Sequence, residues 1–257
     1  MTAQLQDMGD RLVIWNGNTA KRGALSPELY EKITEALETA KEPRVRAVIL
    51  TSEGPFFCAG GDLNVLIARR DMPEAERRDK IDDLHDLVRA MRACPVPVVA
   101  AVEGGAAGAG LSLALACDLI VASQEAKFTA AYVKAGLVPD AGLTSAMARL
   151  LPRPLAMEMC LLGRPVMAIR FAELGAINRL CPEGQAFEQA MNYVDTLAAG
   201  PRAAQGVIRQ LVSDAYEATE AEQLDAERNA MAYAAGAEEA AEGIAAFLEK
   251  RKPDYGK

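Results

Sequence analysis

The chain has 257 residues, of which 51% are hydrophobic and 25% are charged, and its formal net charge is −8. This length and apolar content suffice for one large domain with an ample core. The negative charge excludes nucleic acid as the main partner, because binding to a phosphate backbone needs a basic surface. The longest nearly apolar run, residues 104–117, is too short to cross a bilayer, so no membrane partner is expected.

The N-terminus has neither the positive segment nor the apolar segment of a secretory signal. The five cysteines are odd in number, widely spaced and form no CxxC pair, which favours buried free thiols in a reduced compartment. We therefore expect a cytoplasmic protein. His85 is the only histidine, which removes most zinc sites, and no metal is expected.

Apolar, β-branched segments alternate with helical patterns in the first 185 residues. Ser26 followed by Pro27 predicts the start of a helix that ends near Ala40. This alternation predicts an α/β fold with mainly parallel strands. The expected strands are 12–15, 45–50, 96–102 and 119–121, and the further expected helices are 75–92 and one that begins within 104–110 and continues through 116.

After about residue 185 the strand pattern disappears and only helices are predicted. We therefore expect an α/β core over 1–185 and a helical C-terminal subdomain over 186–257, packed on the core or on a neighbouring chain. The expected C-terminal helices are 187–199, 201–215, 221–235 and 237–250.

Two glycine-bearing turns follow predicted strands. In 58–62, which reads Cys-Ala-Gly-Gly-Asp, small residues would let a ligand approach the backbone, although a plain turn gives the same pattern. The second turn, 104–110, precedes a helix whose first N–H groups would be unpaired.

Three interpretations compete for the second turn. A dinucleotide fold needs GxGxxG after the first strand, whereas these glycines are out of register and lie in mid-chain. An α/β-hydrolase needs a histidine after its nucleophile, but His85 precedes Ser112 and no histidine follows it. The third interpretation is that both turns point at one carbonyl oxygen, so that two backbone N–H groups form an oxyanion hole.

These turns belong to a series of blocks that follow one another along the chain: AKRGALS at 20–26, FCAGGDL at 57–63, 95–110, Phe128 with GLVPDAG at 136–142, 172–177 and AFLEKRKP at 246–253. Through these blocks nearly the whole chain resembles the crotonase (enoyl-CoA hydratase/isomerase) superfamily. The resemblance implies a spiral of ββα units with helices that trimerise, giving a homotrimer or a dimer of trimers. It also implies an acyl-CoA thioester as substrate, with no separate cofactor because coenzyme A is part of the substrate.

The resemblance also assigns site residues by position. The N–H groups of Gly61 and Ala109 would form the oxyanion hole, and the carbonyl of Ala59 would meet the adenine amino group. Residues near the coenzyme A phosphates would be Lys21, Arg22 and Ala24, while Phe247 and Lys250 would reach the coenzyme A of a neighbouring subunit.

The chain departs from hydratases at the two catalytic glutamates, whose positions hold Ser112 and Tyr132. A hydroxyl with a pKa of about 10 or more is a poor base at neutral pH, so Asp140 is the remaining acid–base candidate. The stretch around Asp140 resembles isomerases of epoxide and unsaturated phenylacetyl-CoA. It also resembles 4-chlorobenzoyl-CoA dehalogenase, which has a matching aspartate, an aromatic residue matching Tyr132 and a histidine matching His85, but a Gly-Asn pair where this chain has Val138-Pro139.

Each of these side chains also has a structural interpretation. Asp140 could cap a helix, His85 could be a core histidine paired with a local acid, Ser112 could bond back to a carbonyl one turn earlier, and Tyr132 could be a pocket wall.

We favour proton-transfer isomerisation or ring rearrangement by Asp140, with catalytic contributions from Tyr132, Ser112 and His85 left open. The alternatives are hydration or ring-opening hydrolysis by water, thioester hydrolysis in the same oxyanion hole, and a catalytically weak scaffold that only binds coenzyme A.

Overall fold

The computed structural model describes residues 2–256, which form two β-sheets surrounded by helices. The larger, six-stranded sheet has the order β1-β2-β3-β4-β6-β9, in which β1 is antiparallel to β2 and the remaining pairs are parallel. The predicted α/β fold with mainly parallel strands is therefore confirmed. Its strands are β1 (Ala3–Asp7), β2 (Arg11–Asn16), β3 (Ala47–Ser52), β4 (Val98–Val102), β6 (Leu119–Ser123) and β9 (Arg179–Cys181). The smaller, three-stranded sheet consists of β5 (Gly105–Ala107), β7 (Lys127–Thr129) and β8 (Val166–Met167).

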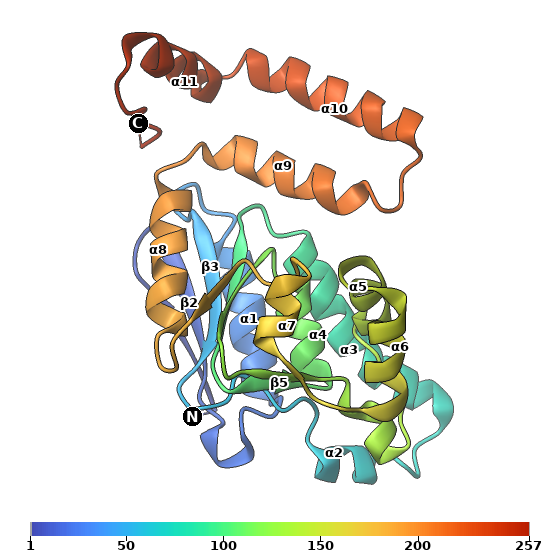
Figure 1. Ribbon diagram of the computed structural model, residues 1–257. Helices are drawn as coiled ribbons and strands as arrows, with labels where there is room; N and C mark the ends of the chain where they lie inside the picture. Colours follow the sequence, from blue (N-terminus) through green and yellow to red (C-terminus); the bar gives the residue numbers. More distant parts are fainter. Residues whose placement is uncertain (1, 257) are drawn as a thin grey trace.

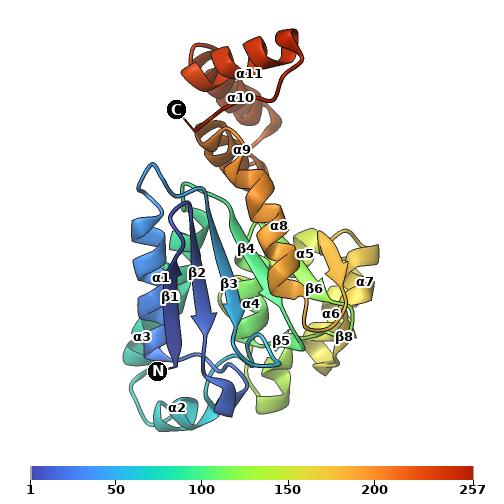
Figure 2. The ribbon, with the colours of Figure 1, turned by 90° about the vertical axis from the view of Figure 1, so that its left-hand side faces the viewer.

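Helices cover both faces of the larger sheet: α1 lies on one face, with α3 and α4 behind it, and α8 crosses the opposite face (Figure 2). The helices of the core are α1 (Pro27–Thr39), α2 (Leu63–Ala68), α3 (Glu74–Arg92), α4 (Ala109–Ala116), α5 (Leu143–Leu150), α6 (Arg153–Leu162), α7 (Ala168–Glu173) and α8 (Ala186–Ala198). Two short 3₁₀ turns, η1 (Thr19–Lys21) and η2 (Ala131–Ala135), and the C-terminal helices α9 (Arg202–Asp214), α10 (Glu220–Ala235) and α11 (Glu238–Glu249) complete the chain.

The alternation of side chains along each strand separates the core into two layers. Leu12 and Ile14 of β2 belong to the apolar cluster that contains Ile33 of α1, whereas Val13 between them packs in the cluster of Val194 on α8. Successive side chains of a strand point to opposite faces, so a strand buried on both sides has to be apolar throughout. This explains why the central strands were recognisable from the sequence.

Local signals place the helix ends where the sequence predicted them. The side chain of Ser26 accepts a hydrogen bond from the N–H of Leu29, and Pro27 occupies the first turn of α1. The four predicted strands and the predicted helices are all present within a few residues of the expected bounds. The short elements β1, β5, β7, β8, β9, α2, α5, α6 and α7 were not predicted.

The four C-terminal helices are not alike in position. The helix α8 packs on the sheet, whereas α9, α10 and α11 extend beyond one end of the core (Figures 1 and 2). The expected division at residues 185 and 186 stays a prediction. Large apolar side chains exposed on α9, α10 and α11 are Val207, Ile208, Val212, Leu224, Met231, Ile244, Phe247 and Leu248, with Tyr233 beside them.

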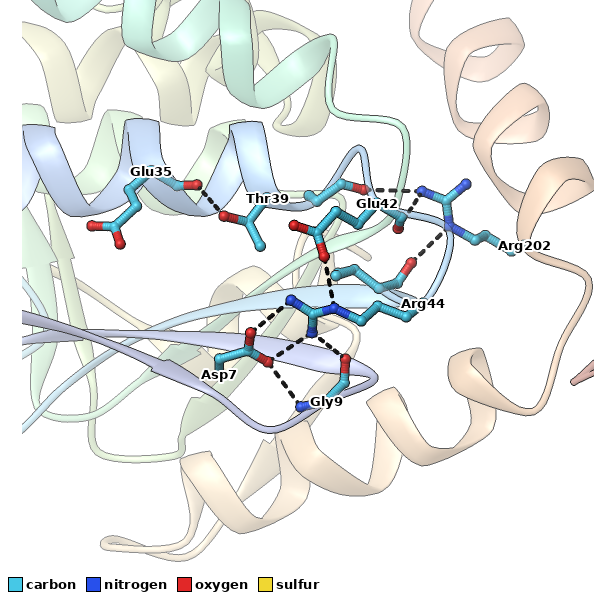
Figure 3. Close-up of polar contacts among 9 residues, drawn as sticks. Asp7, Gly9, Glu35, Thr39, Glu42, Arg44 and Arg202 are labelled. Carbon is cyan, nitrogen blue, oxygen red and sulfur yellow. Dashed lines mark hydrogen bonds and ion pairs between the residues drawn. The ribbon is translucent and has the colours of Figure 1, made fainter.

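Two arginines of α9 fasten it to the core. Arg202 donates hydrogen bonds to the backbone carbonyls of Val45 (2.7 Å), Ala40 (2.9 Å) and Glu42 in the loop that follows α1 (Figure 3). In the same loop Arg44 pairs with Asp7 at 2.7 Å, which ties the loop to β1. The start of α9 is thereby joined to both an edge strand and a helix end.

The second arginine, Arg209, grips the end of α3. Its guanidinium donates to the carbonyls of Met91 (3.1 Å), Arg92 (3.0 Å) and Cys94, and it pairs with Asp118 at 3.0 Å. A cation at this place satisfies the last carbonyls of a helix and complements its dipole.

No helix among residues 2–256 is long and apolar enough to cross a membrane. All five cysteines are free, and Cys160 alone among them is only partly buried, so the predicted free thiols are confirmed.

Candidate active site

The turn after β3 lies directly against the first turn of α4. The Ala107 N–H donates to the Cys58 carbonyl at 2.9 Å, and a Cβ atom added to Gly110 would clash with that carbonyl. A Cβ added to Gly60 would lie 3.0 Å from the Ala109 nitrogen. Glycine at these two positions is what allows the two backbone segments to approach so closely.

This approach places the two expected oxyanion-hole donors next to each other in space. Ala109 is the first residue of α4, where N–H groups have no partner within the helix, and Gly61 follows Gly60. Within residues 2–256, neither the Gly61 N–H nor the Ala109 N–H has a hydrogen-bond acceptor. Two free N–H groups at a helix N-terminus suit a developing negative charge on oxygen.

Ser112, Tyr132 and Asp140 form a hydrogen-bonded chain beside this helix N-terminus. The Tyr132 phenol donates to Oδ1 of Asp140 at 2.6 Å, and the Ser112 hydroxyl lies 3.2 Å from the phenol oxygen and 3.2 Å from the Asp140 carbonyl. The Tyr132 ring also lies 3.9 Å from a Cβ built on Gly108, the residue before the donor Ala109. The structure thus brings the three sequence-predicted side chains together next to the two backbone donors.

Asp140 does not cap a helix. The N-cap of α5 is Gly142, and no side chain accepts a hydrogen bond there. The second carboxylate oxygen of Asp140, Oδ2, accepts no hydrogen bond from any of residues 2–256. The helix-cap interpretation is therefore wrong, and one oxygen of this carboxylate is available for a substrate.

The electrostatics of the site involve a tyrosine that sequence reasoning missed. Burial, together with the Asp140 carboxylate, raises the pKa of Tyr132 well above the ordinary tyrosine value. Burial, and next the charge of Asp140, raises the pKa of Tyr30 on α1 to about 12. Both phenols therefore stay protonated at neutral pH. Nothing in the sequence near Tyr30 signals this proximity, because Asp140 lies far along the chain.

His85 reaches the same corner from the middle of α3. Its Nε2 accepts a hydrogen bond from the Ala141 N–H at 3.1 Å, and its Nδ1 lies 3.8 Å from Oδ1 of Asp82. At this distance Nδ1 makes no hydrogen bond to Asp82, so the interpretation of a core or interface histidine satisfied by a local acid stays a prediction. It omits Nε2, which contacts the backbone next to Asp140.

A cleft of about 440 Å³ lies on the other side of the 57–61 turn. It is lined by Arg22 and Ala59, two of the residues expected at coenzyme A, together with Phe56 and Lys127. The guanidinium of Arg22 lies 4.2 Å from the centroid of the Phe56 ring, an arrangement typical of a cation–π contact. Asp140 does not line this cleft, but Ala59 and Ala107, which do, lie two residues before the expected donors Gly61 and Ala109.

The other residues expected to contact coenzyme A occupy different environments. Lys21 is paired with Asp62, the N-cap residue of α2, at 2.5 Å, and Ala24 is buried. Phe247 and Lys250 lie on or just after α11 and are exposed, at the end of the molecule opposite α2 (Figures 1 and 2). Within one chain they are therefore remote from Arg22 and Ala59.

Two β-sheets surrounded by helices, with two free backbone N–H groups where a strand turn meets a helix, match the arrangement expected from the resemblance to crotonase-type enzymes. The family model for enoyl-CoA hydratase/isomerase matches residues 17–257, and the chain belongs to this family.

Named relatives of this chain include both isomerases and hydratases. It is 34% identical over 234 residues to 1,2-epoxyphenylacetyl-CoA isomerase of Escherichia coli (strain K12), covering 90% of this chain and 89% of that protein. It is 30% identical over 246 residues to 2,3-dehydroadipyl-CoA hydratase of the same organism, covering 95% and 94%. The crystal structure of an enoyl-CoA hydratase from Polaromonas sp. JS666 superimposes with a TM-score of 0.95 at 40% identity over 98% of both chains. The fold and the enzyme class are thereby established.

Proposed function

We propose that the protein isomerises an unsaturated or epoxide-bearing acyl-CoA thioester by proton transfer, with Asp140 as the acid–base group. The observation that carries this proposal is the environment of the Asp140 carboxylate. One oxygen is fixed by Tyr132 at 2.6 Å, the other is free, and the Gly61 and Ala109 donors lie alongside. A held carboxylate beside an oxyanion hole is suited to proton abstraction next to a thioester carbonyl.

For an unsaturated thioester, this one carboxyl group can both remove the proton and return it. Oδ2 of Asp140 takes the proton from the α-carbon, and the C–H electron pair becomes the enolate, whose negative oxygen is stabilised by the Gly61 and Ala109 N–H groups. In an unsaturated thioester the charge extends to the γ-carbon, and the same carboxyl returns the proton there. The double bond moves, and no water or second acid is consumed.

Addition of water is the second candidate, because several relatives are named hydratases. Hydration needs water activated by one group and a proton delivered by another. Ser112 and Tyr132 occupy the positions of the missing glutamates, and the raised pKa of Tyr132 keeps its phenol protonated, so that it can neither accept a proton from water nor readily give one up. Asp140 alone is therefore better matched to isomerisation.

We further propose that the coenzyme A portion of the substrate binds in the cleft at Arg22 and Ala59, near Lys21 and Ala24. The proposal also includes a homotrimer or a dimer of trimers, whose formation would cover the exposed apolar faces of α9, α10 and α11 and bring Phe247 and Lys250 to a neighbour's coenzyme A. The free thiols support a reduced, cytoplasmic location.

The proposal can be tested without knowing the acyl group. Phenylacetyl-CoA and hexanoyl-CoA are incubated with the enzyme in D₂O, and deuterium at the α-carbon is measured by mass spectrometry. The wild type should exchange the α-protons, and Asp140→Asn should slow exchange by about 10²–10⁴-fold while calorimetry shows unchanged thioester binding. Wild-type exchange by Asp140→Asn would overturn the proposal, and absence of exchange in the wild type would favour a scaffold.

A panel of unsaturated and epoxide acyl-CoAs then separates the remaining reactions. Isomerisation leaves the substrate mass unchanged, hydration adds one water, and thioester hydrolysis releases free coenzyme A. We expect products of unchanged mass.

A further inference from the structure

The proposed mechanism does not use His85, although this residue lies in the middle of α3 and contacts the turn that carries Asp140. The contact is made to one peptide group, the one that joins Asp140 to Ala141. Its N–H donates to Nε2 of His85 at 3.1 Å. Its carbonyl accepts from the Ser112 hydroxyl at 3.2 Å and from the Leu143 N–H at 3.1 Å. This peptide group is therefore held on both sides.

The backbone at this place needs such support. Ala141 has a φ of 51°, in the left-handed region, and its side chain is buried with 2% exposure. This conformation is strained for an L-residue other than glycine, and it persists only where the surroundings enforce it. The acceptor provided by His85 is one of the contacts that enforce it.

Fixing this peptide group also fixes the direction of the Asp140 side chain, because the Cα of Asp140 is bonded to its carbonyl carbon. Small displacements of a catalytic group are costly, and a shift of about 1 Å can reduce a rate about 100-fold. The hydrogen bond from Tyr132 orients the carboxylate at its tip, and the peptide contacts orient it at its base.

We propose that His85, in the neutral form that carries its proton on Nδ1, is a positioning residue that aims the Asp140 carboxylate through the Ala141 N–H. This inference rests on the proposed role of Asp140. It differs from a role as base, because the lone pair of Nε2 is already occupied by the Ala141 N–H, and Nδ1 faces Asp82.

The hydrogen bond from the Ala141 N–H to His85 makes the site sensitive to acid. Protonation of Nε2 removes the acceptor and places two N–H donors against each other, so the turn loses its hold. The ionisable groups that packing brings to this corner include Asp82, Asp83 and Arg92 of α3, Arg69 at the end of α2, Tyr30 of α1, and Tyr132 with Asp140 of the neighbouring segment.

The test compares two substitutions of His85 in the full-length enzyme. Gln keeps an acceptor at about the reach of Nε2 but does not titrate, whereas Leu fills the space and accepts nothing. With phenylacetyl-CoA in D₂O at pH about 8, His85→Gln should exchange within about 3-fold of the wild type, and His85→Leu should lose about 10–100-fold in kcat with unchanged thioester affinity. Asp86→Asn, on the exposed face of the same helix, is the matched control and should match the wild type.

The pH profile supplies the second readout. As the pH falls from about 8 to about 5, where histidines gain a proton, the rate of the wild type should fall relative to that of His85→Gln. A constant ratio overturns the proposal, as does His85→Gln being as impaired as His85→Leu, or His85→Leu being fully active. If His85→Leu does not fold, the pH dependence of the exchange rate of His85→Gln, compared with that of the wild type, decides between a positioning role and none. Activity retained by Asp140→Asn would instead refute the proposed function, so the two failures are distinguishable.

Discussion

The phenol of Tyr132 donates a 2.6 Å hydrogen bond to Oδ1 of Asp140, and the raised pKa of the phenol keeps it a donor at every working pH. Tyr132→Phe removes this donor and leaves the ring. A hydrogen bond to a charged group contributes about 1.5–3 kcal/mol, so α-proton exchange should slow by about 10–100-fold without being abolished.

The measurement is the kcat for deuterium exchange in Tyr132→Phe beside Asp140→Asn. A loss as large as that of Asp140→Asn would show that the phenol itself transfers the proton. No loss would make Tyr132 a pocket wall.

The raised pKa of Tyr30 predicts a loss of stability in alkali. Burial and the charge of Asp140 raise it from 10.0 to about 12, so at pH values between these the unfolded chain releases a proton that the folded chain keeps. The contribution is fully present below pH 10 and is lost as the pH rises toward 12, by an amount on the order of 2 kcal/mol.

Urea unfolding of the wild type and Tyr30→Phe at several pH values tests this. The wild type should lose more free energy of unfolding between pH 9 and 12 than the variant does. Parallel curves for the two proteins would show that the Tyr30 phenol titrates alike in both states.

The expected donor at position 61 is a backbone N–H group, so alanine and proline at this position should have different effects on activity. A Cβ on Gly61 would lie 3.6 Å from Cδ1 of Leu66, an ordinary contact, so Gly61→Ala should keep both the fold and the exchange activity. Gly61→Pro lacks the N–H and should lower kcat by about 10²–10³-fold. Equal activity of the two variants, each with a wild-type melting curve, would remove the Gly61 N–H from the oxyanion hole.

The arginine that joins α9 to α3 is expected to control both stability and assembly. The Arg209 side chain is only 8% exposed and binds carbonyls at the end of α3 together with Asp118. Arg209→Met leaves these carbonyls without their donor, whereas Asp118 is exposed and its carboxylate keeps its hydrogen bond from the Val98 N–H, so the substitution should cost about 1–3 kcal/mol of unfolding free energy. If the protein forms the proposed trimer, light scattering should show that Arg209→Met partly dissociates it, because α9 is less firmly held.

The control is Arg228→Met on α10, whose partner Asp225 is also exposed. Surface ion pairs of this kind contribute about 0–1 kcal/mol, so its stability should be nearly unchanged. An unchanged Arg209→Met protein would mean that packing alone holds α9.

Much of the fold was readable from the sequence because its central strands are buried on both faces. Val48 and Ile49 face different layers yet are both apolar, so β3 stands out as a continuous apolar run. The strands β5, β7 and β8 were not readable, since two or three residues are too few to show a pattern and their partners are distant in the chain. Their pairing depends on tertiary contacts.

The site was partly readable for a related reason. Asp140 stands in a stretch rich in glycine and apolar residues, so its charge was conspicuous. The contact between His85 and Ala141 was not predictable, because alanine seldom adopts a positive φ and nothing in its identity signals one. Tyr30 escaped notice because its role depends on how α1 meets a segment far along the chain.

The close approach of Gly110 to the Cys58 carbonyl has a consequence for how this scaffold can be altered. In the proposed mechanism, the part of the site that receives negative charge is built from main-chain atoms and from the absence of side chains, whereas the proton is moved by the side chain of Asp140, beside Ser112 and Tyr132. The two can therefore be exchanged independently. Replacing Ser112 and Tyr132 by glutamate would leave the backbone N–H groups of Gly61 and Ala109 in place and supply the two carboxylates that water addition requires. A few side-chain substitutions in the pocket would then change the reaction without changing the backbone.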